Sequence, residues 1–294
     1  TDLIIQKREK DLVIATQGRA FWVLDDLTLL HQLKDELTSA DAFLFKPEDT
    51  WRTVGGGRGG GGAAVGAVGD NPAAGVVVYY SLKNKVTDEV SLEFLDSNGK
   101  LVKKFSSKAG AEEAGPAGGD EGFGPRGGVA RVTSEAGLNR FVWDMRYPTI
   151  PGATGVYIEA SYAGHKAPPG KYSLTLKFGD KSVTAESEIL ANPLYPTTLA
   201  VYAEHHQKML AMETEVTLMH RMTNSLFEKQ KQLEALLTGL PADEKFAAVK
   251  KDGEALVKKM KAWDEDMVQR KAKAYDDVDN FANKFTANYL FVLN

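Results

Sequence analysis

The sequence predicts a mixed fold in which a mostly β region is followed by an α-helical region. Three observations predict it. Apolar residues recur at about every second position through much of the first two thirds, they recur about every three and a half positions beyond residue 196, and glycine gathers in two patches. The chain has 294 residues, which exceeds one small domain and is enough for more than one core.

Residues 1–46 begin with three short apolar segments that we expect to be strands. The turns between them, KREK and QGR, are tight, so the strands should form an antiparallel meander. Three strands cannot bury two apolar faces, so this meander needs a neighbouring sheet that the rest of the chain does not obviously supply. A short helix-like stretch and a fourth strand that ends at Pro47 complete this part. The expected strands are Asp2–Gln6, Asp11–Thr16, Ala20–Leu24 and Ala42–Lys46, and the helix-like stretch is Leu27–Leu37.

The two glycine patches are predicted to be a linker, residues 47–69, and a loop, residues 109–129. Gly55–Gly69 holds nine of the 28 glycines and Gly110–Gly128 holds eight, without hydrophobic periodicity in either. A phosphate-binding glycine loop needs a strand before it and a helix after it. The first patch leads instead into the strand-like GVVVYYSL, which favours a linker.

Residues 70–191 are predicted to form a β-sandwich of the immunoglobulin or fibronectin type. About seven strands follow one another at the spacing typical of such folds. Asn98-Gly99 supplies the positive φ of a tight hairpin, and Pro168-Pro169-Gly170 gives a stiff turn into an alternating strand. The expected strands are Val76–Leu82, Val90–Leu95, Leu101–Phe105, Arg140–Arg146, Val156–Tyr162, Tyr172–Phe178 and Ser182–Leu190.

Residues 192–294 are predicted to form an antiparallel helical hairpin. The first helix, from about Thr198 to Leu237, has a heptad pattern made by Met209, Met212, Val216, Met219, Leu226, Leu233 and Leu237. Gly239 and Pro241 end it. Thr223, Gln230 and Gly253 interrupt the seam, so the pair should need further support. The second helix, from about Ala242, carries Phe246, Val249, Leu256, Met260, Trp263 and Met267, and the apolar ending KFTANYLFVLN should pack against the rest.

Composition excludes several classes of function. With 36 basic and 40 acidic residues the net charge is −4, which argues against nucleic acid as a partner. The absence of cysteine excludes disulfides, cysteine-bound metals and cysteine nucleophiles. No apolar run reaches the length of a membrane span and no signal peptide precedes Thr1, so we expect no membrane span and a chain cut from something longer.

No complete catalytic constellation emerges, and we assign no catalytic, cofactor-binding or metal-binding residue. Asp25-Asp26 is the nearest acidic pair, but adjacent strand residues point to opposite faces, which favours a turn role. Asp144 and Arg146 share a strand face and are interpreted as a structural contact of the sandwich.

Two metal sites remain as alternatives. His205 and His206 precede a methionine-rich helix, and thioether and imidazole ligands suit copper, yet Met209, Met212 and Met219 already belong to the apolar seam. Core packing is therefore favoured. The acidic run 276–280 suggests calcium but lacks the glycine and the glutamate of an EF-hand loop.

Four segments together resemble a known family: DLVIATQGRAFWVLDDLT, GLNRFVWDMRYP, APPGKYSLTL and AWDEDMVQRKAKAYDDVDNFANKFTANYLFVLN. They resemble the C-terminal region of large exported bacterial proteins with sortilin-like (VPS10-type, BNR-repeat) β-propellers, often labelled glycosyl hydrolases. The resemblance implies that residues 1–26 are outer strands of the last propeller blade, that 70–191 form a FlgD-like sandwich, that a helical extension follows, and that the protein is extracytoplasmic. The family usually has His-Gly-Arg-Gly where this chain has Gln17-Gly18-Arg19-Ala20, so no role of that histidine carries over.

We therefore expect a non-catalytic structural and interaction segment that braces an extracytoplasmic β-propeller or docks it to a protein partner at the cell envelope. The alternative is the accessory C-terminal region of a carbohydrate-active hydrolase of the BNR or sialidase type, in which case a glycan is the ligand. Such hydrolases use paired acids, which the missing blades would have to supply. A copper- or calcium-dependent binder is the third hypothesis.

Overall fold

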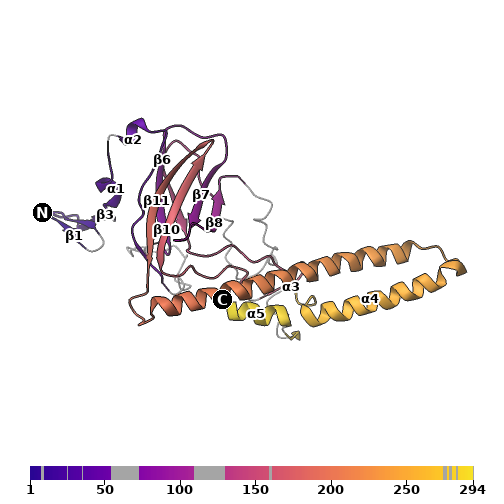
Figure 1. The fold of residues 1–294 in the computed structure, drawn as a ribbon. Coiled ribbons are helices and arrows are strands. Elements are labelled where there is room, and N and C mark those ends of the chain that lie inside the picture. Colours follow the sequence, from indigo (N-terminus) through magenta and orange to yellow (C-terminus); the bar gives the residue numbers. More distant parts are fainter. Residues whose placement is uncertain are drawn as a thin grey trace. The chain divides into compact units, whose positions relative to one another are not determined.

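The computed structural model describes residues 1–7, 10–24, 26–34, 36–53, 73–108, 130–158, 161–273, 277, 280–282 and 284–293. Its strands come first and its long helices last, which confirms the mixed, β-then-α fold class (Figure 1). The chain divides into two compact units. Unit 1 comprises residues 1–109, 130–145 and 168–197, and the described part of unit 2 comprises residues 146–158, 161–167 and the helical region from Thr198 onward. Gly55–Gly69 and Gly110–Gly128 lie outside the described residues, but the predicted linker 47–69 is wrong at its start, because Thr50–Trp51 forms strand β5 beside β11 (Lys181–Leu190).

Unit 1 begins with the predicted three-stranded meander. Strands β1 (Asp2–Gln6), β2 (Asp11–Ala15) and β3 (Phe21–Leu24) form an antiparallel sheet in that order. The β2–β3 turn closes with the Thr16 N–H donating to the Ala20 carbonyl at 3.1 Å. Two one-turn helices follow, α1 (Thr28–His31) and α2 (Glu36–Ser39).

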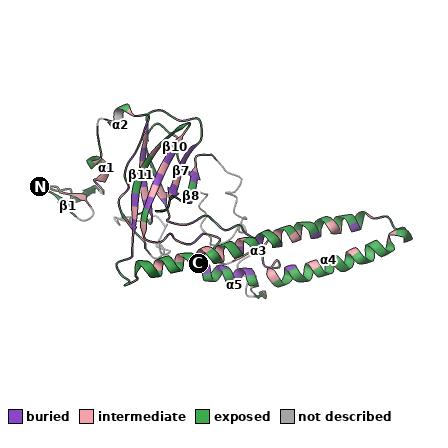
Figure 2. Cartoon of the chain, viewed as in Figure 1, coloured by how far each residue is buried: buried purple, intermediate pink, exposed green. Residues whose placement is uncertain are grey.

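The core of unit 1 lies between two further sheets. One has the strand order β5-β11-β10-β7-β8 and the other β4-β6-β9. Rings from the two sheets meet in the middle, because Phe94 lies 4.4 Å from Trp143 and Phe105 lies 4.7 Å from Phe141 between centroids. Figure 2 shows the alternation of buried and exposed residues along these strands. The bounds are β4 (Ala42–Leu44), β5 (Thr50–Trp51), β6 (Val76–Leu82), β7 (Val90–Leu95), β8 (Leu101–Ser106), β9 (Gly137–Trp143), β10 (Gly170–Phe178) and β11 (Lys181–Leu190).

One expected strand is wrong. The described residues of Val156–Tyr162 are not a strand, and Arg146–Ala167 belongs to unit 2 with the helices. Backbone groups of residues 146–167 bond to helix side chains instead: the Gly152 carbonyl accepts from Asn224 Nδ2 at 3.0 Å, and the His165 N–H donates to the Glu213 carboxylate at 2.7 Å. The apolar run had suggested a strand, but its partners are on a helix. We call residues 146–167 the arm.

Unit 2 contains the predicted helical hairpin. Helix α3 (Leu199–Gly239) starts at Thr198, whose side chain accepts from the Val201 N–H. The 3-10 turn η2 (Glu244–Phe246) leads into α4 (Ala247–Met267), and α5 (Phe285–Leu293) ends the chain. Residues are buried along α3 at intervals of seven, namely Met209, Val216, Thr223, Gln230 and Leu237, and His220 is buried as well.

The second helix buries part of its expected seam. Gly253 and Met260 are half-buried, as expected, and Val257 is buried, whereas Val249, Leu256 and Trp263, which we also expected in the seam, are exposed. A Cβ on Gly253 would lie 2.5 Å from the Leu237 side chain, so the helices approach closely at this glycine and the buried face turns toward it. The apolar C-terminus packs as predicted, with Leu290 and Leu293 in a cluster with Ile150, Met209 and Val216.

Candidate functional site

The three-stranded N-terminal sheet is apolar on both faces. In the observed register, Leu3, Ile14 and Trp22 are cross-strand neighbours on one face. Ile4, Val13 and Val23 are neighbours on the opposite face. Both faces are open to solvent, with Ile4 65% and Trp22 61% exposed. Sheets whose two faces are both apolar normally lie between two other layers, which makes this sheet the strongest candidate for an interaction site.

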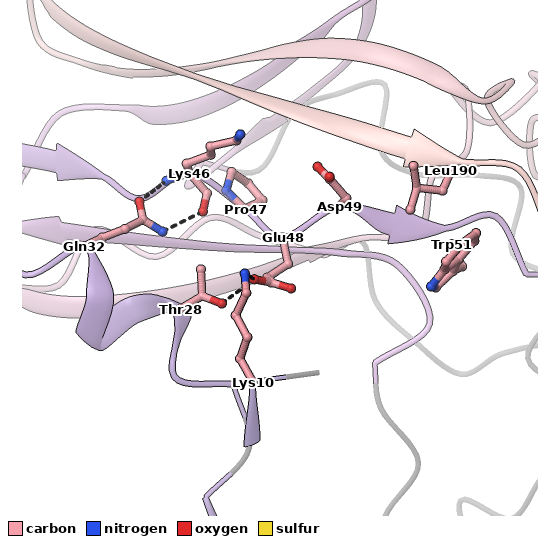
Figure 3. A pocket seen from close by; sticks show the side chains of 9 residues that line it. All are labelled: Lys10, Thr28, Gln32, Lys46, Pro47, Glu48, Asp49, Trp51 and Leu190. Carbon is pink, nitrogen blue, oxygen red and sulfur yellow. Dashed lines mark hydrogen bonds and ion pairs between the residues drawn. The ribbon is translucent and has the colours of Figure 1, made fainter. Parts of the chain in front are cut away.

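Polar contacts fix the segment that follows this sheet. The Glu48 carboxylate accepts from the Lys10 ammonium and the Thr28 hydroxyl (Figure 3). Burial alone would raise the pKa of Glu48, but the hydrogen bonds from Lys10 and Thr28 hold it below its usual value. Gln32 makes a reciprocal pair with the backbone of Lys46, at 2.9 and 2.8 Å. The Asp26 carboxylate accepts from the Thr28 N–H at 2.9 Å, consistent with the turn role expected for this pair, and Asp25 lies outside the described residues.

These side chains line an open pocket of about 350 Å³. Trp51 and Leu190 give it an apolar side, and Asp49 adds a second carboxylate beside Glu48 (Figure 3). Trp51 is 39% exposed, and an exposed indole can stack on the apolar face of a pyranose while a carboxylate such as that of Asp49 accepts a hydroxyl proton. The Glu48 carboxylate and the Gln32 amide already bond to Lys10, Thr28 and the Lys46 backbone.

A chain of hydrogen-bonded rings occupies unit 2. The Glu213 carboxylate accepts from the backbone N–H of His165 at 2.7 Å and contacts its Nδ1 at 2.8 Å. A carboxylate only accepts, so Nδ1 of His165 donates to Glu213, and its Nε2 shares a hydrogen bond with His206 Nδ1 at 2.8 Å. Tyr147 stacks on His165 with ring centroids 4.5 Å apart. The network holds the arm on α3.

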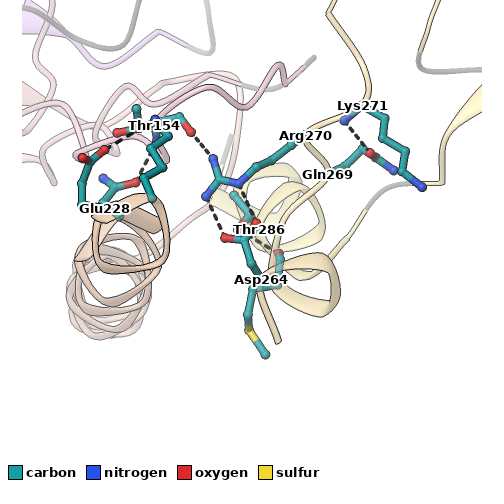
Figure 4. Close-up of polar contacts among 10 residues, drawn as sticks. Thr154, Glu228, Asp264, Gln269, Arg270, Lys271 and Thr286 are labelled. Atoms are coloured by element: carbon teal, nitrogen blue, oxygen red, sulfur yellow. Dashed lines mark hydrogen bonds and ion pairs between the residues drawn. The ribbon is translucent and has the colours of Figure 1, made fainter. Parts of the chain in front are cut away.

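A second polar cluster ties α4 to the arm. The Asp264 carboxylate is buried and accepts two hydrogen bonds from Arg270, at 2.6 Å from Nε and 2.8 Å from Nη2 (Figure 4). The same guanidinium donates to the Thr154 carbonyl and lies over the Phe227 ring at 3.8 Å from its centroid. One arginine therefore joins α3, α4 and the arm, which is a structural role.

The sequence-predicted metal alternatives gain no support from the described residues. Met209 packs in the apolar cluster, and His206 shares a hydrogen bond with His165. Asp276 and Asp279 of the acidic run lie outside the described residues, and Asp277 accepts from the Lys273 N–H at 2.8 Å. Where the structure describes side chains, no group of three or more His, Asp or Glu could hold a metal ion.

Two other expectations concern Asp144 and Arg146. Asp144 forms an ion pair with Lys103 at 3.6 Å, and Arg146 donates to the Gly164 carbonyl at 2.8 Å. Strand β9 ends at Trp143, so Asp144 and Arg146 lie beyond it and do not share the strand face that we expected. Arg146 belongs to unit 2. The sequence interpretation also missed His165 and Glu213, since a single histidine and a single glutamate 48 positions apart carry no local signal.

None of the described helices is both long enough and apolar enough to cross a bilayer. Comparison with known proteins finds no matching family model, no matching curated protein and no matching solved structure.

Proposed function

We propose that this chain is a non-catalytic structural and interaction segment, and that its N-terminal sheet completes a larger β-structure. The observation that carries this proposal is the sheet formed by β1, β2 and β3, whose two faces are both apolar and both exposed. The sequence resemblance suggests which partner this is: the remaining blades of an extracytoplasmic β-propeller of the sortilin-like type. The two-sheet body of unit 1 would then be the immunoglobulin-like or FlgD-like domain, which braces or docks that propeller.

Energetics support burial of this sheet. Phe21, Trp22, Val23 and Leu24 are each more than half exposed, and covering such side chains stabilises a fold by roughly 1.5–3 kcal/mol each. A lone three-stranded sheet with open apolar faces is marginal in water. Two covering layers would supply what the sheet lacks, and a flanking strand would pair with the outer edge of β1 or β3.

The test is amide hydrogen exchange of the full chain in its native assembly, purified from its source, against the isolated chain. We expect strong protection of residues 2–24 in the assembly only, together with cross-links from Lys7 or Lys10 to a β-rich polypeptide. Trp22→Ser should weaken the assembly, whereas Leu138→Ser, which alters an equally exposed leucine on β9, should not. Equal exchange of residues 2–24 in both samples would refute the proposal.

A second candidate function is the accessory region of a carbohydrate-active hydrolase, with a glycan as ligand. The pocket of Trp51, Glu48 and Asp49 favours it. Titration of the full chain with a panel of oligosaccharides should then show binding that Trp51→Ala abolishes and Leu138→Ser leaves unchanged. Binding that survives Trp51→Ala would remove this candidate.

A further inference from the structure

Histidines gather where the arm packs on helix α3. The chain has five histidines, and three of them, His165, His206 and His220, form hydrogen bonds between these two segments. His165 lies on the arm, whereas His206 and His220 lie on α3. His165 is 3% exposed and His220 is 0% exposed. Histidine is the side chain whose charge ordinarily changes between pH 5 and 8, so this contact contains the groups that a pH sensor needs.

The bond between His165 and His206 uses a single hydrogen. His165 Nδ1 donates to the Glu213 carboxylate at 2.8 Å, and His165 Nε2 lies 2.8 Å from His206 Nδ1. If His165 alone becomes a cation, it can donate to both Glu213 and His206, and the network stays intact. If both rings become cations, two N–H groups face each other and the bond between the rings is lost. The ring centroids are 5.0 Å apart, so the two positive charges also repel each other.

His220 disfavours any further proton. Its Nδ1 donates to the Pro151 carbonyl at 2.6 Å, because a carbonyl only accepts. Its Nε2 is buried and has no hydrogen-bond partner among the described residues. A second proton on this ring would therefore place an unpaired charge inside the contact, and burial lowers the pKa of His220 for this reason.

Other charged and titratable groups surround this contact. Charged and phenolic side chains that lie on the described arm or contact it are Arg146, Tyr147, Tyr162, Lys166, Glu213 and Arg270. Helix α5 contributes the apolar Leu290 and Leu293. Carboxylates, phenols, ammonium and guanidinium groups ordinarily titrate outside the range from pH 5.5 to 7.5, so the histidines govern the response within it.

We propose that the arm is a pH-sensitive switch: below about pH 6.5, protonation of the His165–His206 pair and of His220 releases the arm from α3. Release exposes all three rings to water, where each binds a proton near pH 6.5. The docked arm allows one added proton on the pair and disfavours one on His220. The released state therefore binds more protons, and acid favours it. The switch lies within unit 2 and goes beyond the function proposed above.

The expected size of the response follows from proton linkage. For each proton that only the released state binds, the ratio of released to docked arm rises about tenfold between pH 7.5 and pH 5.5. The pair and His220 each offer such a proton, so the response should lie between about tenfold and about 100-fold. Release also uncovers the apolar cluster that Ile150 of the arm forms with Met209 and Val216 of α3.

The test is amide hydrogen exchange of the full chain at pH 7.5 and pH 5.5, expressed as protection factors so that the intrinsic pH dependence of exchange is removed. The informative amides are those of Ile150, which donates to the Tyr162 carbonyl at 2.7 Å, and of His165, which donates to Glu213 at 2.7 Å. Their protection should fall about tenfold or more at pH 5.5. Amides of α3 near Val216 should stay more protected than the arm at both pH values, because release leaves the hydrogen bonds of the helix intact.

Asparagine variants identify the groups responsible. Asparagine offers an amide near the position of Nδ1 but takes up no proton. In His206→Asn with His220→Asn the protection of the arm should change less than about twofold between the two pH values. Each single substitution should remove part of the response, which keeps the test decisive if the double variant does not fold. His205→Asn, which alters an exposed histidine of the same helix, is the matched control and should respond as the original chain does.

Three results would overturn the proposal. The first is equal protection of the arm amides at pH 7.5 and pH 5.5. The second is equal protection of the arm and of α3 at pH 5.5, since the unit would then unfold as a whole and not release its arm. The third is an undiminished response in both His206→Asn and His220→Asn.

Discussion

Replacing Arg270 should destabilise unit 2 more than any exposed ion-pair residue does. Asp264 is buried, and its two oxygens accept from Arg270 Nε and Nη2 at 2.6 and 2.8 Å. Arg270→Ala removes both donors and leaves a buried carboxylate without its cation, which costs roughly 3–5 kcal/mol. The Thr154 carbonyl loses a donor and Phe227 loses its guanidinium cover in the same step.

Hydrogen exchange across a urea series is the suitable assay, because two units need not unfold together and a single midpoint would mix them. Amides of α4 and of the arm near Thr154 should lose protection in Arg270→Ala. The matched control is Lys231→Ala, since Lys231 also lies over Phe227, at 4.2 Å, but is exposed and should cost less than about 1 kcal/mol. A loss below about 1 kcal/mol for Arg270→Ala would refute the reasoning. The double variant Asp264→Leu with Arg270→Met replaces the ion pair by apolar groups and should recover most of the lost stability. If it does not, the reasoning is refuted as well.

Three further predictions concern single positions. Ala20 has φ of 58°, so Ala20→Gly should stabilise the β2–β3 turn by about 1 kcal/mol, measured by exchange of the β3 amides; faster exchange would contradict this. Burial lowers the pKa of His220 below its ordinary value of 6.5, although the hydrogen bond from its Nδ1 to the Pro151 carbonyl acts in the opposite direction. Below about pH 6.5 the unfolded chain therefore binds a proton that the folded chain does not. The stability of unit 2 should therefore fall toward pH 5.5 by up to about 1.4 kcal/mol per pH unit, and in denaturation at both pH values His220→Asn should flatten that slope. Gly253→Ala should crowd the Leu237 side chain. In a double-mutant cycle, Leu237→Ala should therefore lower the free energy of unfolding by at least about 1 kcal/mol less in the Gly253→Ala background than in the original chain. Additive losses would argue against the close approach of the two helices.

Local patterns predicted most of the elements because each element has a physical signature within a few residues. Alternation in Tyr172–Phe178 and the Asn98-Gly99 turn gave strands and a hairpin with nearly correct bounds. The heptad of α3 gave its seam, including the polar Thr223 and Gln230. The exposed apolar faces of the N-terminal sheet were predictable, because three strands alone cannot bury apolar residues on both faces.

What the sequence could not predict depends on contacts between distant segments. The arm has the apolar composition of a strand, and only the position of His220 and Asn224 on α3 shows why its carbonyls pair with a helix. The network of Glu213, His165 and His206 could not be predicted either, because its members lie on segments whose proximity no local pattern encodes. In α4 the sequence predicted Gly253 and Met260 in the contact but also Val249, Leu256 and Trp263, which are exposed, because spacing alone does not show which stripe approaches α3.

The middle of the contact between α3 and α4 is polar. Thr223 is completely buried, and its hydroxyl has no hydrogen-bond partner among the described residues. Gln230 occupies the next seam position, so the middle of the α3–α4 contact buries polar atoms where a self-sufficient hairpin would bury leucines. Leu256 lies outside this polar part of the contact and is half exposed. A helix pair that buries polar residues in its contact is less stable than one that buries leucines, so the hairpin depends on the arm and α5, which pack on α3 around Met209 and Val216.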